Sequence, residues 1–172
     1  MKKAAAIVLE TPRLIFREWL PDDWVRFKPI ATNPRVIGYV GTGQPPSDEQ
    51  IQTYIEAARK LYRDEGFCLW PLVYRENQEL IGFCGFDRLW GGEEIEIGYW
   101  LAPDYWGKGL ATEAARAVVR YGRDTLGLRR IVAVVQPENK ASVRVLEKLG
   151  MIREKTVSHE GVEHVFYRSG GP

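Results

Sequence analysis

Apolar residues along the chain follow strand-like spacing in its middle and near its end. Two apolar runs, residues 67–74 and 80–86, flank a polar turn and predict an antiparallel hairpin. Residues 94–101 alternate strictly between the two faces of a strand. One face carries Ile95, Ile97, Tyr99 and Leu101, and the other carries Glu94, Glu96, Gly98 and Trp100. The continuous apolar run 131–135 predicts a strand covered on both faces. Shorter strands are expected at residues 13–17, 152–158 and 162–167.

Segments with helical spacing lie between these strands. Ser47 and Gln50 form a capping-box pattern at the start of a helix whose apolar residues continue to Tyr62. Another helix follows residue 109 and ends at Gly127, and a third covers residues 139–149 before Gly150. One more helix is expected to start near residue 22, where a proline precedes two carboxylates. This order of elements predicts a single α/β domain, residues 1–172, built on a mixed central sheet.

Length and charge exclude several classes of protein. A chain of 172 residues is typical of one domain. Its 24 Lys and Arg against 23 Asp and Glu leave a net charge of +1, which argues against a nucleic-acid partner. No stretch approaches the roughly 20 apolar residues of a membrane helix, so no membrane partner is expected. The apolar run at residues 4–9 is shorter than the roughly 7–15 residues of a signal-peptide core.

The two cysteines predict no disulfide framework. If the hairpin closes at residues 77–78, Cys68 lies opposite Asp87 and Cys84 opposite Pro71, so the two thiols are not partners. Small apolar side chains within strands are the simpler reading. Together with the absence of targeting segments, this predicts a cytoplasmic protein. Six tryptophans, more than such a core needs, stand at positions 19, 24, 70, 90, 100 and 106.

The segment most informative about function is the glycine loop, residues 106–112, between a predicted strand and a predicted helix. Small residues there leave backbone N–H groups uncovered at the positive end of a helix dipole, which favours a bound phosphate. Neither common phosphate motif fits. A Walker A loop needs Ser or Thr where Gly109 stands, and a Rossmann fingerprint needs glycine where Thr112 stands. Simple turn chemistry is the alternative.

Three sequence motifs resemble one known family. The segment EIGYWLAPDYWGKGLATEA, residues 96–114, looks like the acetyl-coenzyme A motif of the GNAT superfamily of N-acetyltransferases, and closest is its RimJ/RimL-like branch. NKAS at residues 139–142 followed by EKLGM at 147–151 resembles the next motif, and TPRL at 11–14 resembles the usual opening of that branch. The resemblance implies a GNAT-like fold, with helices on both faces of the sheet and splayed strands that hold the cofactor.

The resemblance also implies a set of cofactor-binding residues. Backbone groups of Tyr99, Trp100 and Leu101 would pair with pantetheine and polarise the thioester carbonyl. The pyrophosphate would be wrapped by the N–H groups of Gly107, Lys108, Gly109, Leu110, Ala111 and Thr112. Asn139 would hydrogen-bond the cofactor from the neighbouring strand–helix turn. A plain helix N-cap is the alternative for Asn139.

The implied reaction is direct transfer of an acetyl group from acetyl-coenzyme A to a primary amine, either a protein N-terminus or a small molecule. Glu96 is the candidate general base, because it lies on the non-apolar face of its strand beside Gly98. Ser142 matches a serine proposed as proton donor in RimL-type members. The alternatives are a solvated strand carboxylate for Glu96 and a helix-start residue for Ser142.

Departures from the family pattern keep other functions open. Leu146 stands where many members carry tyrosine, so the usual acid role does not transfer and a non-catalytic acyl-coenzyme A-binding module is an alternative. A nucleotide-phosphate binder using the same loop is another. His159 and His164 lack clustered cysteines or carboxylates, so no metal cofactor is expected. Residues 31–44 and 158–163 would shape the pocket of the amine acceptor, and a homodimer stays open.

Overall fold

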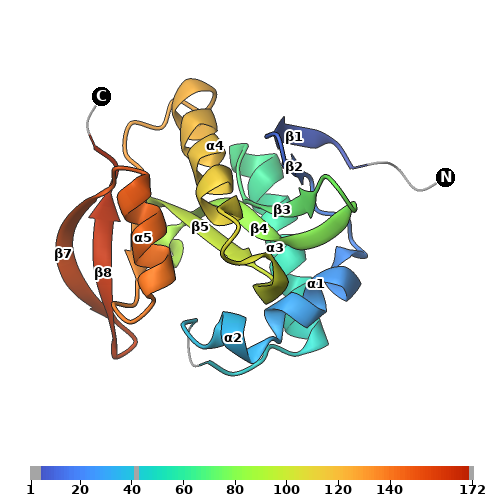
Figure 1. Cartoon of the computed structure of the whole chain (residues 1–172), viewed down its shortest axis with the longest axis horizontal. Helices are drawn as coiled ribbons and strands as arrows, with labels where there is room; N and C mark the ends of the chain where they lie inside the picture. Colours follow the sequence, from blue (N-terminus) through green and yellow to red (C-terminus); the bar gives the residue numbers. More distant parts are fainter. Residues whose placement is uncertain (1–4, 41–42, 171–172) are drawn as a thin grey trace.

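A single eight-stranded sheet forms the centre of the computed structural model, which describes residues 5–40 and 43–170 (Figure 1). The strands are β1 (Ile7–Glu10), β2 (Leu14–Arg17), β3 (Leu69–Tyr74), β4 (Glu79–Arg88), β5 (Ile95–Leu101), β6 (Val132–Val135), β7 (Ile152–His159) and β8 (Val162–Arg168). Their order in the sheet is β1-β2-β3-β4-β5-β6-β8-β7. All neighbours are antiparallel except β5 and β6, which are parallel. The predicted mixed sheet is confirmed.

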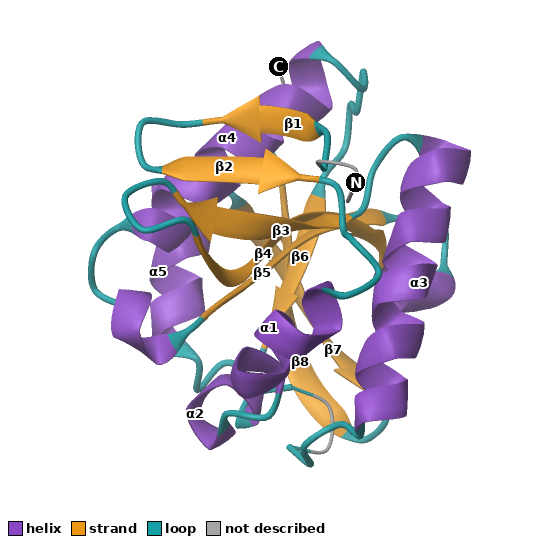
Figure 2. Cartoon of the chain, turned by 90° about the vertical axis from the view of Figure 1, so that its right-hand side faces the viewer, coloured by secondary structure: helices purple, strands orange, loops and turns teal. Residues whose placement is uncertain are grey.

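Helices cover both faces of this sheet, as expected (Figure 2). They are α1 (Asp23–Ala31), α2 (Pro34–Ile37), α3 (Asp48–Glu65), α4 (Leu110–Asp124) and α5 (Lys140–Lys148), with short 3₁₀ turns η1 (Leu89–Gly91) and η2 (Pro103–Tyr105). Helices α4 and α5 lie on one face and α3 on the other (Figure 2). Within residues 5–40 and 43–170, no helix combines the length and apolar character needed to cross a bilayer.

The helix boundaries follow from local capping. Ser47 Oγ accepts from the Gln50 amide at 3.2 Å and the Gln50 side chain accepts from the Ser47 amide at 2.8 Å, so the predicted capping box starts α3. Gly66, with φ of 81°, ends the same helix in the left-handed conformation. Helix α4 stops at Asp124, earlier than the predicted end at Gly127.

Three local features depart from the sequence-based expectation. Strand β1 comes from a run that the sequence indicated only as too short for a signal peptide, and α2 is a four-residue helix capped by Asn33. The hairpin register is also displaced by one residue, so Cys84 pairs with Trp70 and not with Pro71. The turn has four residues where two were expected, and a bulge at Ile81 takes up part of the difference. Cys68 and Cys84 are buried and free.

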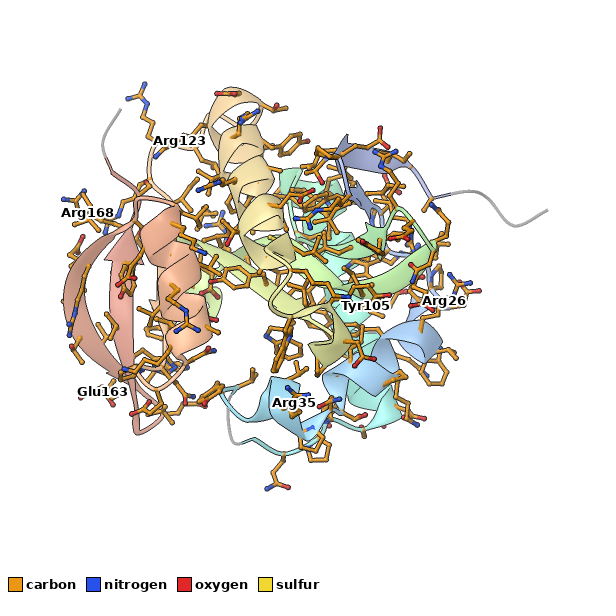
Figure 3. All side chains as sticks on the ribbon, in the orientation of Figure 1. Arg26, Arg35, Tyr105, Arg123, Glu163 and Arg168 are labelled. Atoms are coloured by element: carbon orange, nitrogen blue, oxygen red, sulfur yellow. The ribbon has the colours of Figure 1, made fainter. Side chains whose placement is uncertain are left out.

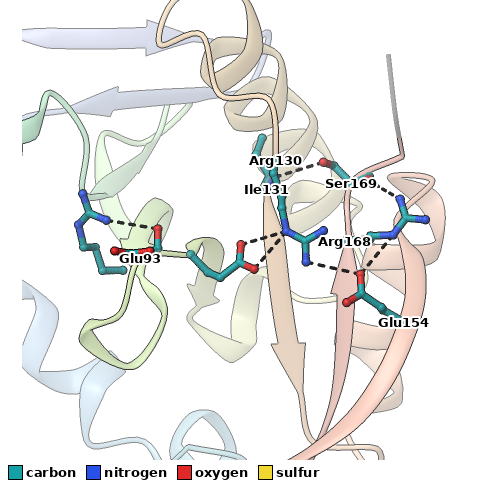
Figure 4. Close-up of polar contacts among 8 residues, drawn as sticks. Glu93, Arg130, Ile131, Glu154, Arg168 and Ser169 are labelled. Carbon is teal, nitrogen blue, oxygen red and sulfur yellow. Dashed lines mark hydrogen bonds and ion pairs between the residues drawn. The ribbon is translucent and has the colours of Figure 1, made fainter.

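Strands β5 and β6 meet at only one end. Their sole pairing is Glu96 with Val132, and beyond this bridge the strands diverge. The closed end carries a chain of ion pairs, in which Arg130 contacts Glu94 at 3.1 Å and Glu154 at 3.5 Å (Figure 4). Arg168 adds a contact to Glu154 at 3.2 Å. The sheet is therefore held together across β5 and β6 at one end and opens toward the other.

Close packing of α4 on the sheet depends on Gly122. A Cβ at this position would lie 2.5 Å from Cζ of Phe86 and 3.3 Å from Cδ1 of Leu128. Phe86 is fully buried in the core, so it has little room to move away.

We therefore expect Gly122→Ala to destabilise the protein. Alanine gains about 1 kcal/mol of helix propensity over glycine, but overpacking costs about 1–3 kcal/mol. Urea unfolding should show a net loss of up to about 2 kcal/mol in the free energy of unfolding. Arg120→Ala, at an exposed position of the same helix, should stay within about 0.5 kcal/mol of the wild type. An increase in the unfolding midpoint of Gly122→Ala would contradict the close contact.

Candidate functional site

A cavity of about 790 Å³ opens where β5 and β6 diverge. All of the sequence-predicted site residues line it except Lys108. Those that line it are Glu96, Tyr99, Trp100, Leu101, Gly107, Gly109, Leu110, Ala111, Thr112, Asn139 and Ser142. The chain thus brings the strand, the glycine loop and the start of α5 to one place.

The glycine loop presents peptide N–H groups to this cavity. Gly107 and Gly109 have φ of 72° and 76°, a conformation that non-glycine residues rarely adopt. Gly109 is the N-cap of α4 and makes no side-chain cap bond. The first amides of α4 therefore have no intrahelical acceptor, and the positive end of the helix dipole points the same way. Both features fit a phosphate or pyrophosphate group.

An ion-pair brace holds the glycine loop from behind. Arg13 donates to the Lys108 carbonyl at 2.9 Å and contacts Glu113 of α4 at 2.6 Å. Glu113 also accepts from the Thr11 hydroxyl at 2.7 Å. Burial opposes ionisation of Glu113, but the bonds from Thr11 and Arg13 outweigh it and lower the pKa of this carboxyl. Lys108 thus contributes its carbonyl to the brace, while its ammonium lies over the Tyr105 ring.

Peptide groups of β5 face the gap at alternate residues. The Ala102 amide donates to Ile81 of β4 at 2.7 Å, so the peptide groups of Trp100 also point toward β4. Those of Tyr99 and Leu101 then point toward the gap. The Leu101 carbonyl already accepts from the Trp106 indole N–H at 2.7 Å. Three peptide groups therefore remain without a partner on this edge: the N–H groups of Tyr99 and Leu101 and the carbonyl of Tyr99. They can hydrogen-bond a ligand that itself contains amide groups, such as a pantetheine arm.

Glu96 is a partly buried carboxylate with a perturbed pKa. Burial, and then the charge of Asp87 directly opposite on β4, raises the pKa of Glu96 from 4.5 to about 7. The side-chain carboxylate of Glu96 makes no hydrogen bond or ion pair with any residue that the structure describes. It shares its face of the sheet with Gly98 and Trp100. A solvated strand carboxylate would not have this environment, whereas a general base near neutral pH needs it.

Helix α5 supplies the other wall near its first turn. Asn139 caps the helix by accepting from the Ser142 amide at 3.1 Å, so the structural role of Asn139 is present whether or not it also contacts a cofactor. The Tyr99 hydroxyl donates to the Ser142 carbonyl at 3.2 Å and ties β5 to α5. The Ser142 side chain hydrogen-bonds with the Tyr99 hydroxyl, and the side-chain cap of α5 comes from Asn139 instead. Leu146 is buried and presents no polar group to the cavity.

The structure also brings in side chains that the sequence did not single out; one of them, Arg35, falls within the run 31–44 that was expected to shape the acceptor pocket. Tyr54 of α3 reaches the cavity, and its hydroxyl is buried without a hydrogen-bond partner in the described residues. Arg35 of α2 also lines the cavity, with its guanidinium 4.9 Å from the centre of the Trp106 ring. Figure 3 labels Arg35 on α2 and Tyr105 in η2, and both residues line the cavity. Arg144 and Lys148 add positive charge from α5. These positions carry no local motif.

The six tryptophans separate by location. Trp100 and Trp106 line the cavity, whereas the other four do not. Trp19 and Trp70 are core residues on opposite faces of the sheet, Trp24 packs on the core, and Trp90 is exposed. Trp90 stacks on His159 at 4.1 Å between ring centres. His164 contacts Trp90 and lines the cavity, and no group of three or more His, Cys, Asp or Glu side chains suited to a metal occurs among the described residues.

Comparison with known proteins identifies the class that this fold and cavity define. A family model described as an acetyltransferase (GNAT) domain matches residues 13–152. That match spans most of the chain, which therefore belongs to the GNAT family and is an acetyl-transfer enzyme.

Individual relatives agree with this assignment. The uncharacterized N-acetyltransferase YoaA of Bacillus subtilis (strain 168) is 36% identical over 166 residues, covering 96% of this chain and 91% of YoaA. A GNAT-family acetyltransferase from Bacillus anthracis has a similar crystal structure, with a TM-score of 0.79, 29% identity and coverage of 95% and 96% of the two chains. RimL, a ribosomal L7/L12 alpha-N-protein acetyltransferase in complex with coenzyme A, shares the fold with a TM-score of 0.81, 18% identity and coverage of 95% and 97%.

The raised pKa of Glu96 predicts a pH dependence of stability. The unfolded chain loses the Glu96 proton near pH 4.5, whereas the folded protein keeps it to about pH 7. The free energy of unfolding therefore falls as pH rises through this window, by up to roughly 3 kcal/mol from this group. For Glu96→Gln, urea unfolding should show a smaller decrease in the free energy of unfolding between pH values near 5 and near 7.5 than for the wild type.

A matched variant controls for the loss of one surface charge. Glu94 lies on the same strand segment and pairs with Arg130 at the exposed end. Glu94→Gln should retain the wild-type fall in stability over the same pH range. If the free energy of unfolding falls equally for Glu96→Gln and for the wild type, the Glu96 carboxyl does not titrate near neutral pH.

Proposed function

We propose that the protein transfers the acetyl group of acetyl-coenzyme A directly to the nitrogen of a primary amine. The observation that carries this proposal is the joint position of an anion-binding helix start, free peptide groups of β5 and the Glu96 carboxylate around one cavity. Membership of the GNAT family supports the use of acetyl-coenzyme A, and RimL shares this fold in a coenzyme A complex. The TPRL opening and the Trp106 loop favour the RimJ/RimL-like branch.

Cofactor binding would use backbone groups more than side chains. The N–H groups of Gly107, Lys108, Gly109, Leu110, Ala111 and Thr112 are the pyrophosphate donors that the motif predicts, with Lys108 outside the cavity lining. Tyr99 and Leu101 would pair with the pantetheine arm, and the peptide groups of Trp100 face β4 instead. Asn139 would add a side-chain amide, and the cations of Arg144 and Lys148 would favour a polyanionic cofactor.

The reaction needs a neutral amine and a polarised carbonyl. The Glu96 carboxylate accepts one proton from the incoming ammonium, directly or through a water molecule. The amine nitrogen then forms the new N–C bond and gives a tetrahedral oxyanion; as this collapses, the C–S bond breaks and the electron pair leaves on sulfur. The proton lost from nitrogen in this step ends on the thiol, so one proton is released to solvent overall. The N–H groups facing the gap stabilise the oxyanion formed between these events.

Ser142 is the candidate donor of the proton to sulfur. Ser142 lines the cavity and its side chain hydrogen-bonds with the Tyr99 hydroxyl, whereas Leu146 has no proton to give. A water molecule is the alternative donor. The acceptor would be a protein N-terminus or a small-molecule amine. Of the two runs expected to shape its pocket, residues 31–44 contribute Ala31, Arg35, Val36, Tyr39 and Val40 to the cavity lining, with residues 41–42 outside the described chain, and none of residues 158–163 lines the cavity.

The test of the proposed function is coenzyme A thiol release that depends on an added amine. Wild-type kcat/KM should rise with pH and level off above an inflection near 7, because Glu96 must be ionised to accept the proton. Glu96→Gln should lower turnover by about 10²–10⁴-fold and lose this inflection, with unchanged acetyl-coenzyme A affinity. An unchanged inflection would remove Glu96 from the mechanism. Tight cofactor binding without turnover on any amine would favour a non-catalytic acyl-coenzyme A-binding module.

Gly109→Asp should weaken cofactor binding. The new carboxylate would oppose a pyrophosphate at the start of α4, while its Cβ would meet only Arg13, at an ordinary 3.7 Å. Calorimetry should show at least about a tenfold loss of acetyl-coenzyme A affinity. Gly91→Asp has the same charge change at a similar φ of 72° with nothing within 4 Å, and it should bind like the wild type. Equal affinities for the two variants would place the cofactor elsewhere.

A further inference from the structure

Four aromatic rings form one surface on the Glu96 side of the cavity. This aromatic cup consists of Phe27, Tyr54, Phe83 and Trp100, all of which line the cavity. The Phe83 ring centre lies 4.9 Å from that of Trp100, 5.7 Å from Phe27 and 6.0 Å from Tyr54. Helices α1 and α3 thus supply two rings and the sheet supplies the other two. Such a surface favours an apolar, flat or branched ligand body.

Two polar groups interrupt the aromatic cup. Glu96 is on the same face of the sheet as Phe83 and Trp100, because the Asp87–Glu96 pair is four cross-strand pairs, an even number, away from the Phe83–Trp100 pair. The Tyr54 hydroxyl is the second polar group, and it is buried without a partner in the described residues. Folded proteins leave few buried hydroxyl groups unpaired, so this oxygen points to a missing ligand atom. It can accept a hydrogen bond from an ammonium and donate one to a carboxylate.

The charges around the cavity restrict the acceptor to one positive group. Among the cavity-lining residues that the structure describes, Glu96 is the only carboxylate, while Arg35, Arg144 and Lys148 are cations. The ammonium that reacts would be paired with Glu96 and with the faces of the aromatic rings. A second ammonium, as in a polyamine, would be desolvated without a partner or would face Arg35.

The chain also crosses the acceptor side of the cavity. The Gln136 side chain, just beyond β6, donates to the Tyr39 carbonyl at 3.2 Å. Both residues line the cavity, and Arg35 on the same segment as Tyr39 stacks on Trp106. These two contacts connect the α2 segment to β6 and to the glycine loop. A protein N-terminus followed by further chain would have to displace them, whereas a small molecule would not.

We propose that the acceptor is a small primary monoamine on an aromatic or branched aliphatic body, with its nitrogen between the Glu96 carboxylate and the Tyr54 hydroxyl. This inference rests on the proposed acetyl transfer. Tyr54 is a substrate-contacting residue here, and it orients the nitrogen without taking its proton. Burial first, and then the negative charges of Asp87 and Glu96, raise the pKa of the Tyr54 hydroxyl, so it stays protonated.

An amine panel tests the acceptor class by thiol release. We compare 2-phenylethylamine and isopentylamine with spermidine and with a short peptide that begins with alanine. The two monoamines should exceed spermidine and the peptide in kcat/KM by at least about tenfold. Equal or better use of spermidine or the peptide overturns this inference but leaves acetyl transfer intact. Acetyl-coenzyme A binding without transfer to any amine overturns the proposed function itself.

A hydroxyl-deletion variant tests the contact to Tyr54. Tyr54→Phe should raise KM for 2-phenylethylamine by about tenfold, with kcat and acetyl-coenzyme A affinity nearly unchanged. Its unfolding midpoint should equal or exceed that of the wild type, because the variant removes an unpaired buried oxygen. Tyr62→Phe, on the same helix but outside the cavity lining, should leave KM unchanged. An unchanged KM for Tyr54→Phe, or a lower unfolding midpoint, would show that the hydroxyl has a structural role only.

Discussion

The separation of β5 from β6 after one bridge, Glu96 with Val132, is the constraint on which the rest of the structure depends. Neighbouring parallel strands normally satisfy each other's peptide groups. Here the strands part, and each is followed by a helix that starts at the open end, α4 after β5 and α5 after β6. The unpaired amides of two strands and two helix starts therefore gather around one gap. A polyanionic ligand with an amide-rich arm satisfies these groups in a way that water or a side chain would not.

The other face of the same strands makes Glu96 useful. A carboxylate on an open strand would ionise near its ordinary pKa, but α1 and α3 pack over this face with Phe27 and Tyr54. Gly98 leaves space next to Glu96 that is closed by Leu69, whose Cδ2 would lie 3.0 Å from a Cβ at that position. Burial of the carboxyl is thus a product of helix packing against a strand with little side-chain bulk. In the proposed reaction, the peptide groups on one edge of β5 would bind the cofactor, and the carboxylate would act from the face of the strand.

Much of this arrangement was predictable because it depends on local pattern. Alternation along 94–101, the capping box at Ser47 and the glycine loop are short-range signals, and the structure has the corresponding strand, helix start and αL glycines. The hairpin register was wrong because the turn has four residues where two were expected; a bulge at Ile81, which leaves no trace in the apolar pattern, reduces the displacement to one residue. Tyr54 could not be found, since it reaches the cavity only through packing of a helix distant in sequence from β5, and Arg35 was covered only by the broad run 31–44 expected to shape the acceptor pocket. Helix α2 was also not predicted, because it has only four residues and an Asn33 cap, too short a segment to show a helical pattern.

A carboxyl group that titrates at about pH 7 also makes the resting protein a mixture of two protonation states. At neutral pH, about half of the molecules already carry the Glu96 proton. A cationic ligand binds the ionised half, so association must expel roughly half a proton per site on average. The heat measured on binding such a ligand will consequently include the ionisation enthalpy of the buffer. Experiments in phosphate and in Tris will differ for this reason alone.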